Sequence, residues 1–230
     1  MIQGDLTFQG QPRPITTPPD GVSQWIQSLP NDQIVHDHWE REYCQRNAVK
    51  AAVREIFNPS PDDVIIISDV DEIPDPRHLE EAVKKARQGW VVCFNQIHTY
   101  FALNLVDSEP WYGTRMLTWA KLQITTPQNM RSVISKDSRY FLEPQHLMQQ
   151  GGWHFGWVGD KQAIRDKVAS FCHVELNTAE LMSDSYLDHC LKQKVTVHNG
   201  HQLSILPMEL LPECVQANPE RYKHLMASVL

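Results

Sequence analysis

The chain has 230 residues, which is enough for one sizeable domain, and we expect a single domain over residues 1–230. Hydrophobic residues make up 41% and charged residues 21% of the chain, as in ordinary globular proteins. The net charge of -7 argues against a broad nucleic-acid-binding surface, although it permits phosphate binding at one local site.

Targeting signals are not evident in the sequence. The chain has no run of about 18 apolar residues, which argues against a membrane-spanning helix. Its first residues show neither the basic region nor the apolar stretch of a secretory signal. The five cysteines are scattered and form no C-x-x-C pair, so neither zinc nor a disulfide framework is expected. We therefore expect a soluble, cytoplasmic protein without a membrane span.

The first third of the chain begins with a loop-rich segment. Residues 1–31 hold many prolines and other turn formers, and a short strand is expected over 33–36. Asp37 and Glu40 then form a capping-box pattern, and apolar residues at helical spacing predict an amphipathic helix over 38–57.

A strand–helix–strand pattern follows. Residues 64–67 are an unbroken run of Val and Ile, which predicts a strand buried on both faces, as in a parallel sheet. Asp75 starts the next helix, which Gly89 ends, and a second buried strand is expected over 90–94. This order predicts a parallel crossover. The part of the chain from 33 to 95 would be the nucleotide- and metal-binding half.

The remaining half, residues 96–230, is the predicted acceptor side. Residues 97–125 are expected to be extended and rich in aromatic residues, and 152–158 to form a strand. Apolar spacing predicts helices over about 160–171 and 179–191. The expected fold class is therefore α/β, with a mostly parallel central sheet flanked by helices.

Residues 67–74 read Ile-Ser-Asp-Val-Asp-Glu-Ile-Pro and carry the strongest chemical signal. Asp69 and Asp71 come directly after a predicted strand, where ligands of open α/β sheets bind. Carboxylates suit Mg²⁺ and Mn²⁺, which keep sites open for substrate phosphates. The motif therefore predicts a metal–phosphate site, and the competing interpretation is a solvated, charged strand terminus.

An Asp-x-Asp motif after a buried strand is also found in haloacid-dehalogenase-like phosphatases, with the first aspartate as nucleophile. Those enzymes usually have a small Thr or Val four residues after the first aspartate, where this chain has Ile73. No later acidic pair on a strand is evident that would complete their magnesium site. This class is the first alternative.

Several further strings accompany the acidic motif. They are Trp-Glu-Arg-Glu at 39–42, Gln-Arg-Asn at 45–47, Gly-Trp-His-Phe at 152–155 and Ser-Phe-Cys-His-Val-Glu at 170–175. Together with the Ser-Asp-Val-Asp-Glu-Ile-Pro string, their order and spacing resemble glycosyltransferase family 17 over about residues 5–180.

The resemblance implies a GT-A-like nucleotide-diphospho-sugar transferase fold. It also implies a UDP-sugar donor such as UDP-GlcNAc, a divalent metal, a glycan acceptor and inversion at the anomeric carbon. Asp69 and Asp71 correspond to the motif aspartates, of which the second tends to reach the metal directly. In the family a strand and a helix precede the segment that matches residues 7–10, so part of the uridine pocket is expected to be missing. An inactive glycan-binding remnant is the second alternative.

Three residues are candidates for donor binding. Arg46 and Asn47 lie on the predicted helix before the acidic strand, and a guanidinium pairs well with phosphate oxygens. Arg131 could face the diphosphate as well. The competing interpretation is a salt bridge within a charged helix for Arg46 and a plain surface position for Arg131.

The remaining candidates are a histidine and three carboxylates. His154 could complete the coordination begun by Asp71, hydrogen-bond the diphosphate, or be a buried structural histidine. An inverting transfer needs a base, for which Glu175 is the first candidate and Asp160 and Glu72 are the others. If residues 173–175 are extended, Glu175 faces the same side as the histidine two residues before it, and the two could instead form a structural pair.

Overall fold

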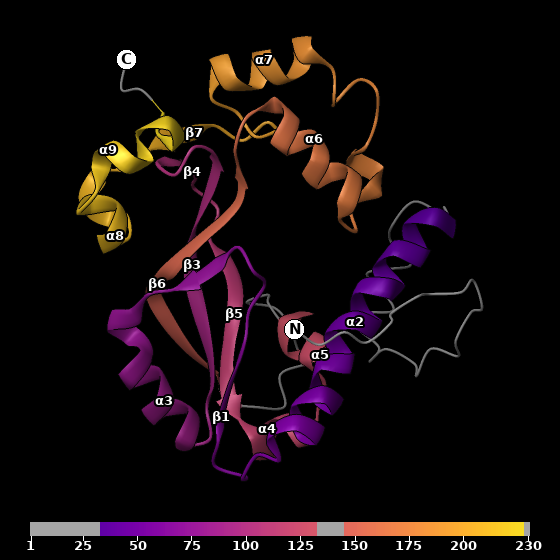
Figure 1. Ribbon diagram of the computed structural model, residues 1–230, viewed down its shortest axis with the longest axis vertical. Helices are drawn as coiled ribbons and strands as arrows, with labels where there is room; N and C mark the ends of the chain where they lie inside the picture. Colours follow the sequence, from indigo (N-terminus) through magenta and orange to yellow (C-terminus); the bar gives the residue numbers. More distant parts are fainter. Residues whose placement is uncertain (1–32, 133–144, 228–230) are drawn as a thin grey trace.

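The computed structural model describes residues 33–132 and 145–227 (Figure 1). The loop predicted over 1–31 lies outside these residues. The described helices are α2 (Gln33–Phe57), α3 (Leu79–Arg87), α4 (Trp119–Gln123), α5 (Pro127–Ser132), α6 (Lys161–Ser170), α7 (Asp184–Gln193), α8 (Glu213–Gln216) and α9 (Pro219–Tyr222). The described strands are β1 (Val64–Ile67), β2 (Glu72–Pro74), β3 (Val91–Phe101), β4 (Leu105–Asp107), β5 (Trp111–Thr118), β6 (Gln145–Val158) and β7 (Leu203–Ile205).

The fold is α/β, but its sheet is mostly antiparallel, so the prediction of a mostly parallel sheet is wrong. The strand order is β1-β5-β3-β4-β7, and β6 pairs with both β3 and β2. Only the β3–β6 pair is parallel among the described strands. Strands β1 and β3 do run in the same direction, as the crossover pattern predicts. The reversed strand β5 lies between them, however, and pairs with both.

Strand β1 is only partly buried, which corrects the expectation of a strand covered on both faces. The side chain of Ile66 is 46% exposed, and within the described ranges β1 pairs with β5 alone. A short apolar run does not by itself distinguish a central strand from an edge strand.

The helix before β1 begins earlier than predicted. Helix α2 already includes residues 33–36, so the strand expected there is wrong and Asp37 lies inside the helix. A helix after Asp75 is confirmed, but Asp75 caps the 3-10 turn Pro76–His78, where it accepts a hydrogen bond from the backbone N–H of Arg77 at 2.9 Å. Helix α3 follows at Leu79, and Gly89 ends the segment with a φ of +94°.

The second half of the chain contains the predicted elements with shifted ends. The strand expected over 152–158 is the last part of β6, and the helix expected over 160–171 is α6. The helix expected over 179–191 begins later, at Asp184, because Ser183 caps it. The extended segment over 97–125 ends in the short helix α4.

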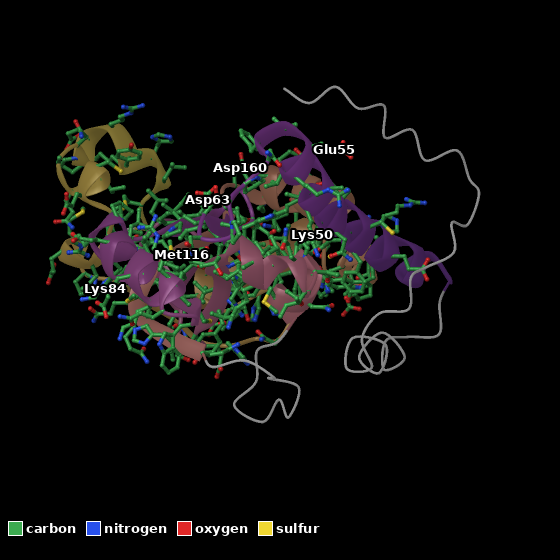
Figure 2. The ribbon with its side chains drawn as sticks, turned by 90° about the horizontal axis from the view of Figure 1, so that it is seen from below. Lys50, Glu55, Asp63, Lys84, Met116 and Asp160 are labelled. Carbon is green, nitrogen blue, oxygen red and sulfur yellow. The ribbon has the colours of Figure 1, made fainter. Side chains whose placement is uncertain are left out.

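Helices cover both faces of the sheet. Helix α3 packs on one face against Val92, Phe94 and Met116. On the other face α2, α4 and α5 pack against β1 and β5 around Leu117 and Trp119. Seen from below, α3 with Lys84 and α2 with Lys50 lie on opposite sides of the molecule (Figure 2).

Helices α6 and α7 lie beyond one end of the sheet, where β6 leads into α6 (Figure 1). They pack on a separate cluster that includes Tyr100, Trp157 and Leu187. None of the helices within 33–132 and 145–227 has the length and apolar character that crossing a membrane requires.

The β2–β6 pairing depends on Gly152, which lies opposite Pro74 with a φ of +135°. A Cβ atom there would overlap the carbonyl oxygen of Ile73 and lie 2.8 Å from the backbone nitrogen of Asp75. We expect Gly152→Ala to lower the free energy of unfolding, measured by chemical denaturation, by more than about 1 kcal/mol. Gly89→Ala is the matched control, because its φ is also positive but no atom lies within 4 Å of the added Cβ. Equal losses in the two variants would contradict this role of Gly152.

Candidate functional site

The acidic motif forms the tight turn that joins β1 to β2. The backbone N–H of Glu72 donates to the carbonyl of Asp69 at 3.1 Å, and the backbone N–H of Asp69 donates to a carboxylate oxygen of Glu72 at 3.0 Å. The backbone N–H of Phe155 donates to the carbonyl of Asp71 at 2.9 Å, which holds the turn against β6. The turn therefore places the predicted site at the end of β1, beside β6.

Glu72 is the buried centre of this turn. Its side chain is fully buried and accepts hydrogen bonds from the Trp111 indole at 2.7 Å and from the Arg131 guanidinium. Burial raises the pKa of Glu72, but the hydrogen bond and charge of Arg131 outweigh it, so the pKa lies below its usual value. These bonds favour a structural role for Glu72 over the predicted role as base.

Asp69 is paired with two arginines, which the sequence predicts to face the donor diphosphate. Its carboxylate accepts from Arg131 at 2.6 Å and from Arg46 at 3.2 Å, and its side chain is 41% exposed. Arg46 also reaches Glu42 at 2.7 Å on the same helix. Both predicted arginines thus meet at the first aspartate of the motif.

Asn47 joins two helices beside the site. Its side-chain oxygen accepts a hydrogen bond from the backbone N–H of Gln128 at 3.0 Å. The Gln128 side chain in turn accepts from Arg46. Asn47 therefore links α2 to α5 and helps to position the arginines, and among the described residues it makes no hydrogen bond to the motif carboxylates.

Asp71 is paired with a lysine that the sequence analysis missed. The Lys167 ammonium lies 2.9 Å from one oxygen of Asp71, and Nε2 of His154 lies 3.5 Å from the other. Burial raises the pKa of Asp71, but the hydrogen bonds and charges of His154 and Lys167 outweigh it and hold the pKa well below its usual range. Asp71 is therefore a permanent anion at neutral pH.

His154 lies in a stack of rings beside the motif. Its ring stacks on Trp111 at 4.2 Å and on His98 at 4.5 Å between centroids. Burial lowers the pKa of His98 to about 3, so that ring stays neutral. Nδ1 of His154 is buried and has no hydrogen-bond partner among the described residues. His154 is thus held in a fixed orientation with one ring nitrogen directed toward Asp71.

The other two predicted bases lie away from the motif. Asp160 caps α6, where it accepts from the backbone N–H of Ala163 at 2.8 Å. Glu175 lies in a short 3-10 turn over Val174–Leu176, not in an extended segment. Its carboxylate nevertheless meets His173, at 2.6 Å from Nδ1. In the part of the chain that the structure describes, neither carboxylate contacts Asp69 or Asp71.

The described side chains at this site offer few ligands for a metal ion unless a substrate supplies more. Within the two described ranges, no group of three or more His, Cys, Asp or Glu side chains could hold a metal. Oδ1 of Asp71 and Nε2 of His154 lie 3.5 Å apart. This oxygen and this nitrogen are suitable ligands for Mn²⁺, and a diphosphate would supply further oxygens. The donor set therefore fits a shared protein–substrate metal site.

Comparison with known proteins found no matching protein-family model, no matching curated protein and no matching solved structure. The likeness to glycosyltransferase family 17 therefore remains a prediction that rests on the sequence motifs and on the site that they form.

The Glu72–Arg131 pair gives the first test of this site. Arg131→Ala leaves the buried Glu72 carboxylate without its cation, so we expect a loss of about 3–5 kcal/mol in the free energy of unfolding. Arg54→Ala, at an exposed position near the end of α2, should cost less than about 0.5 kcal/mol. Similar losses in both variants, measured by urea denaturation, would contradict the structural role of the pair.

The same pair predicts an acid-dependent stability. Because the pKa of Glu72 is lower in the folded chain than in the unfolded chain, its contribution is complete above the unfolded-chain pKa. It is lost as the pH falls through the folded-state pKa. Glu72→Gln should therefore flatten part of the acid limb of a plot of stability against pH. An unchanged acid limb would show that Glu72 is not ion-paired.

Proposed function

We propose that this chain is an inverting, metal-dependent glycosyltransferase that moves a sugar, GlcNAc from UDP-GlcNAc in the first instance, to a hydroxyl of a glycan. The observation that carries the proposal is the convergence of two aspartates with three cations at the end of β1. Asp69 meets Arg46 and Arg131, and Asp71 meets Lys167. Elements far apart in the sequence supply these groups, as expected of a binding site.

The cations suit the diphosphate of a sugar nucleotide. Guanidinium groups bind phosphate oxygens through paired hydrogen bonds, and an ammonium binds them as a point charge. Arg46 and Lys167 each keep part of their side chain exposed, at 15% and 28%. A diphosphate can therefore replace the aspartates as a partner of these cations.

Asp71 and His154 would hold the divalent metal, Mn²⁺ or Mg²⁺, together with oxygens of the donor. When bound, the metal neutralises charge on the diphosphate and so stabilises the nucleoside diphosphate as it leaves. Trp111 and His98 hold the ring of His154 by stacking against it, with centroids at 4.2 Å and 4.5 Å. Lys167 would pass from Asp71 to a phosphate oxygen as the metal takes its place.

The phosphatase alternative is less well supported. Its nucleophile would be Asp69, whose carboxylate is held by Arg131 at 2.6 Å and by Arg46 at 3.2 Å. A carboxylate in two such pairs is a poor nucleophile because its charge is already neutralised. The strand before it, β1, is partly exposed and pairs with the antiparallel strand β5, so it does not lie in the middle of a parallel sheet.

The proposal is tested by UDP release from UDP-GlcNAc in the presence of Mn²⁺ and a biantennary N-glycan. Turnover should require the metal, and Asp71→Asn should lower it by about 100-fold or more, because metal binding supplies several kcal/mol. Asp62→Asn is the matched control, since Asp62 is an exposed turn residue outside the site. Equal turnover in Asp71→Asn and the parent would refute the mechanism. Metal-independent glycan binding without turnover would favour the inactive glycan-binding alternative.

A further inference from the structure

His173 and Glu175 form a pair whose chemistry the acidic motif does not use. Nδ1 of His173 lies 2.6 Å from a carboxylate oxygen of Glu175. Nδ1 can donate its hydrogen to the carboxylate, and in that tautomer the lone pair of the neutral ring lies on Nε2. The pair can therefore present an imidazole nitrogen that accepts a proton.

The imidazole is the accessible member of the pair. The His173 side chain is 37% exposed and the Glu175 side chain 24%. The second carboxylate oxygen of Glu175 is buried and has no hydrogen-bond partner among the described residues. Trp39 meets the His173 ring edge-on at 4.6 Å, and Phe171 lies at 5.2 Å, so the ring is held from two further sides. An acceptor would reach His173 before Glu175.

Two series of contacts connect the pair with the acidic motif. The first route follows helix α2, on which Trp39 contacts His173. Arg46 lies two turns, or about 10 Å, further along the same helix and contacts Asp69. Through α6, Lys167 contacts Asp71 and lies 5.8 Å from the Trp157 ring.

The second route continues from Trp157 to the pair. Phe171 packs edge-on against Trp157 at 5.8 Å and also lies next to His173. Both routes thus connect the pair with the proposed donor site, one through α2 and the other through α6.

We propose that His173 is the catalytic base of the transfer and that Glu175 is its positioning residue. This inference rests on the proposed glycosyltransferase function and differs from the expectation that the Glu175 carboxylate is itself the base. As the acceptor oxygen bonds to the anomeric carbon, its proton passes to Nε2 of His173. The bond from that carbon to the phosphate oxygen breaks, and UDP leaves with the electron pair. Glu175 stabilises the imidazolium that forms.

The first test is His173→Ala in the UDP-release assay with UDP-GlcNAc, Mn²⁺ and a biantennary N-glycan. We expect kcat to fall by about 100- to 10,000-fold while the KM for UDP-GlcNAc stays near that of the parent. Added imidazole should restore part of the lost rate. His189→Ala, at an exposed position on α7, is the control and should leave kcat unchanged.

The second test is Glu175→Gln, whose amide oxygen still accepts the hydrogen bond from Nδ1 but carries no charge. We expect a loss in kcat without a matching change in KM, and Glu175→Asp should recover part of it. His173→Gln keeps a polar side chain at the position, and it should be as inactive as His173→Ala. Thermal unfolding of each variant checks that the fold is retained.

Three outcomes overturn the inference in different ways. If His173→Ala keeps the parent kcat while Glu175→Gln loses it, the carboxylate is the base. If both variants keep the parent kcat, the pair is structural, and the proposed function still stands. If the parent releases no UDP, the proposed function fails and the assignment of His173 fails with it.

Discussion

The site depends on one buried ion pair, between Glu72 and Arg131. The Glu72 side chain is fully buried and that of Arg131 is 9% exposed, so each charge requires the other. This pair fixes α5 against the turn after β1, and through it Arg131 also reaches Asp69. The indole of Trp111 completes the set of hydrogen bonds on Glu72. A carboxylate one residue after the Asp-x-Asp motif thus acts as the internal anchor that presents the motif.

In the structure every charged group of the motif already has a partner. Asp69 is neutralised by two arginines and Asp71 by Lys167, with His154 beside it. Such a site stays stable without substrate, because no charge is left uncompensated. We propose that a diphosphate and a metal enter together, so that the phosphates take the cations and the metal takes the carboxylate. Binding would then exchange ion pairs and would not create net charge in the site.

The sequence was sufficient for local elements and insufficient for long-range pairing. The cap at Asp75 and the apolar spacing of α6 were visible locally, and the strand before the motif was correctly placed. The relative directions of the strands were not predicted correctly, because β5, which comes later in the chain, lies between β1 and β3. Lys167 was missed for the same reason, since it lies 96 positions from Asp71 and carries no motif of its own. Arg46 and His154 were named because they lie in recognisable strings, whereas Arg131 was named without a motif of its own.

The central claim is that the diphosphate of a sugar nucleotide replaces the internal ion pairs of the acidic motif when a metal is present. Calorimetric titration of the protein with UDP, with and without Mn²⁺, tests this claim directly. The account predicts saturable binding that requires Mn²⁺ and weakens as the salt concentration rises, because charged groups carry it. Binding of UDP with equal affinity in the presence and absence of Mn²⁺, or no binding at all, would contradict it.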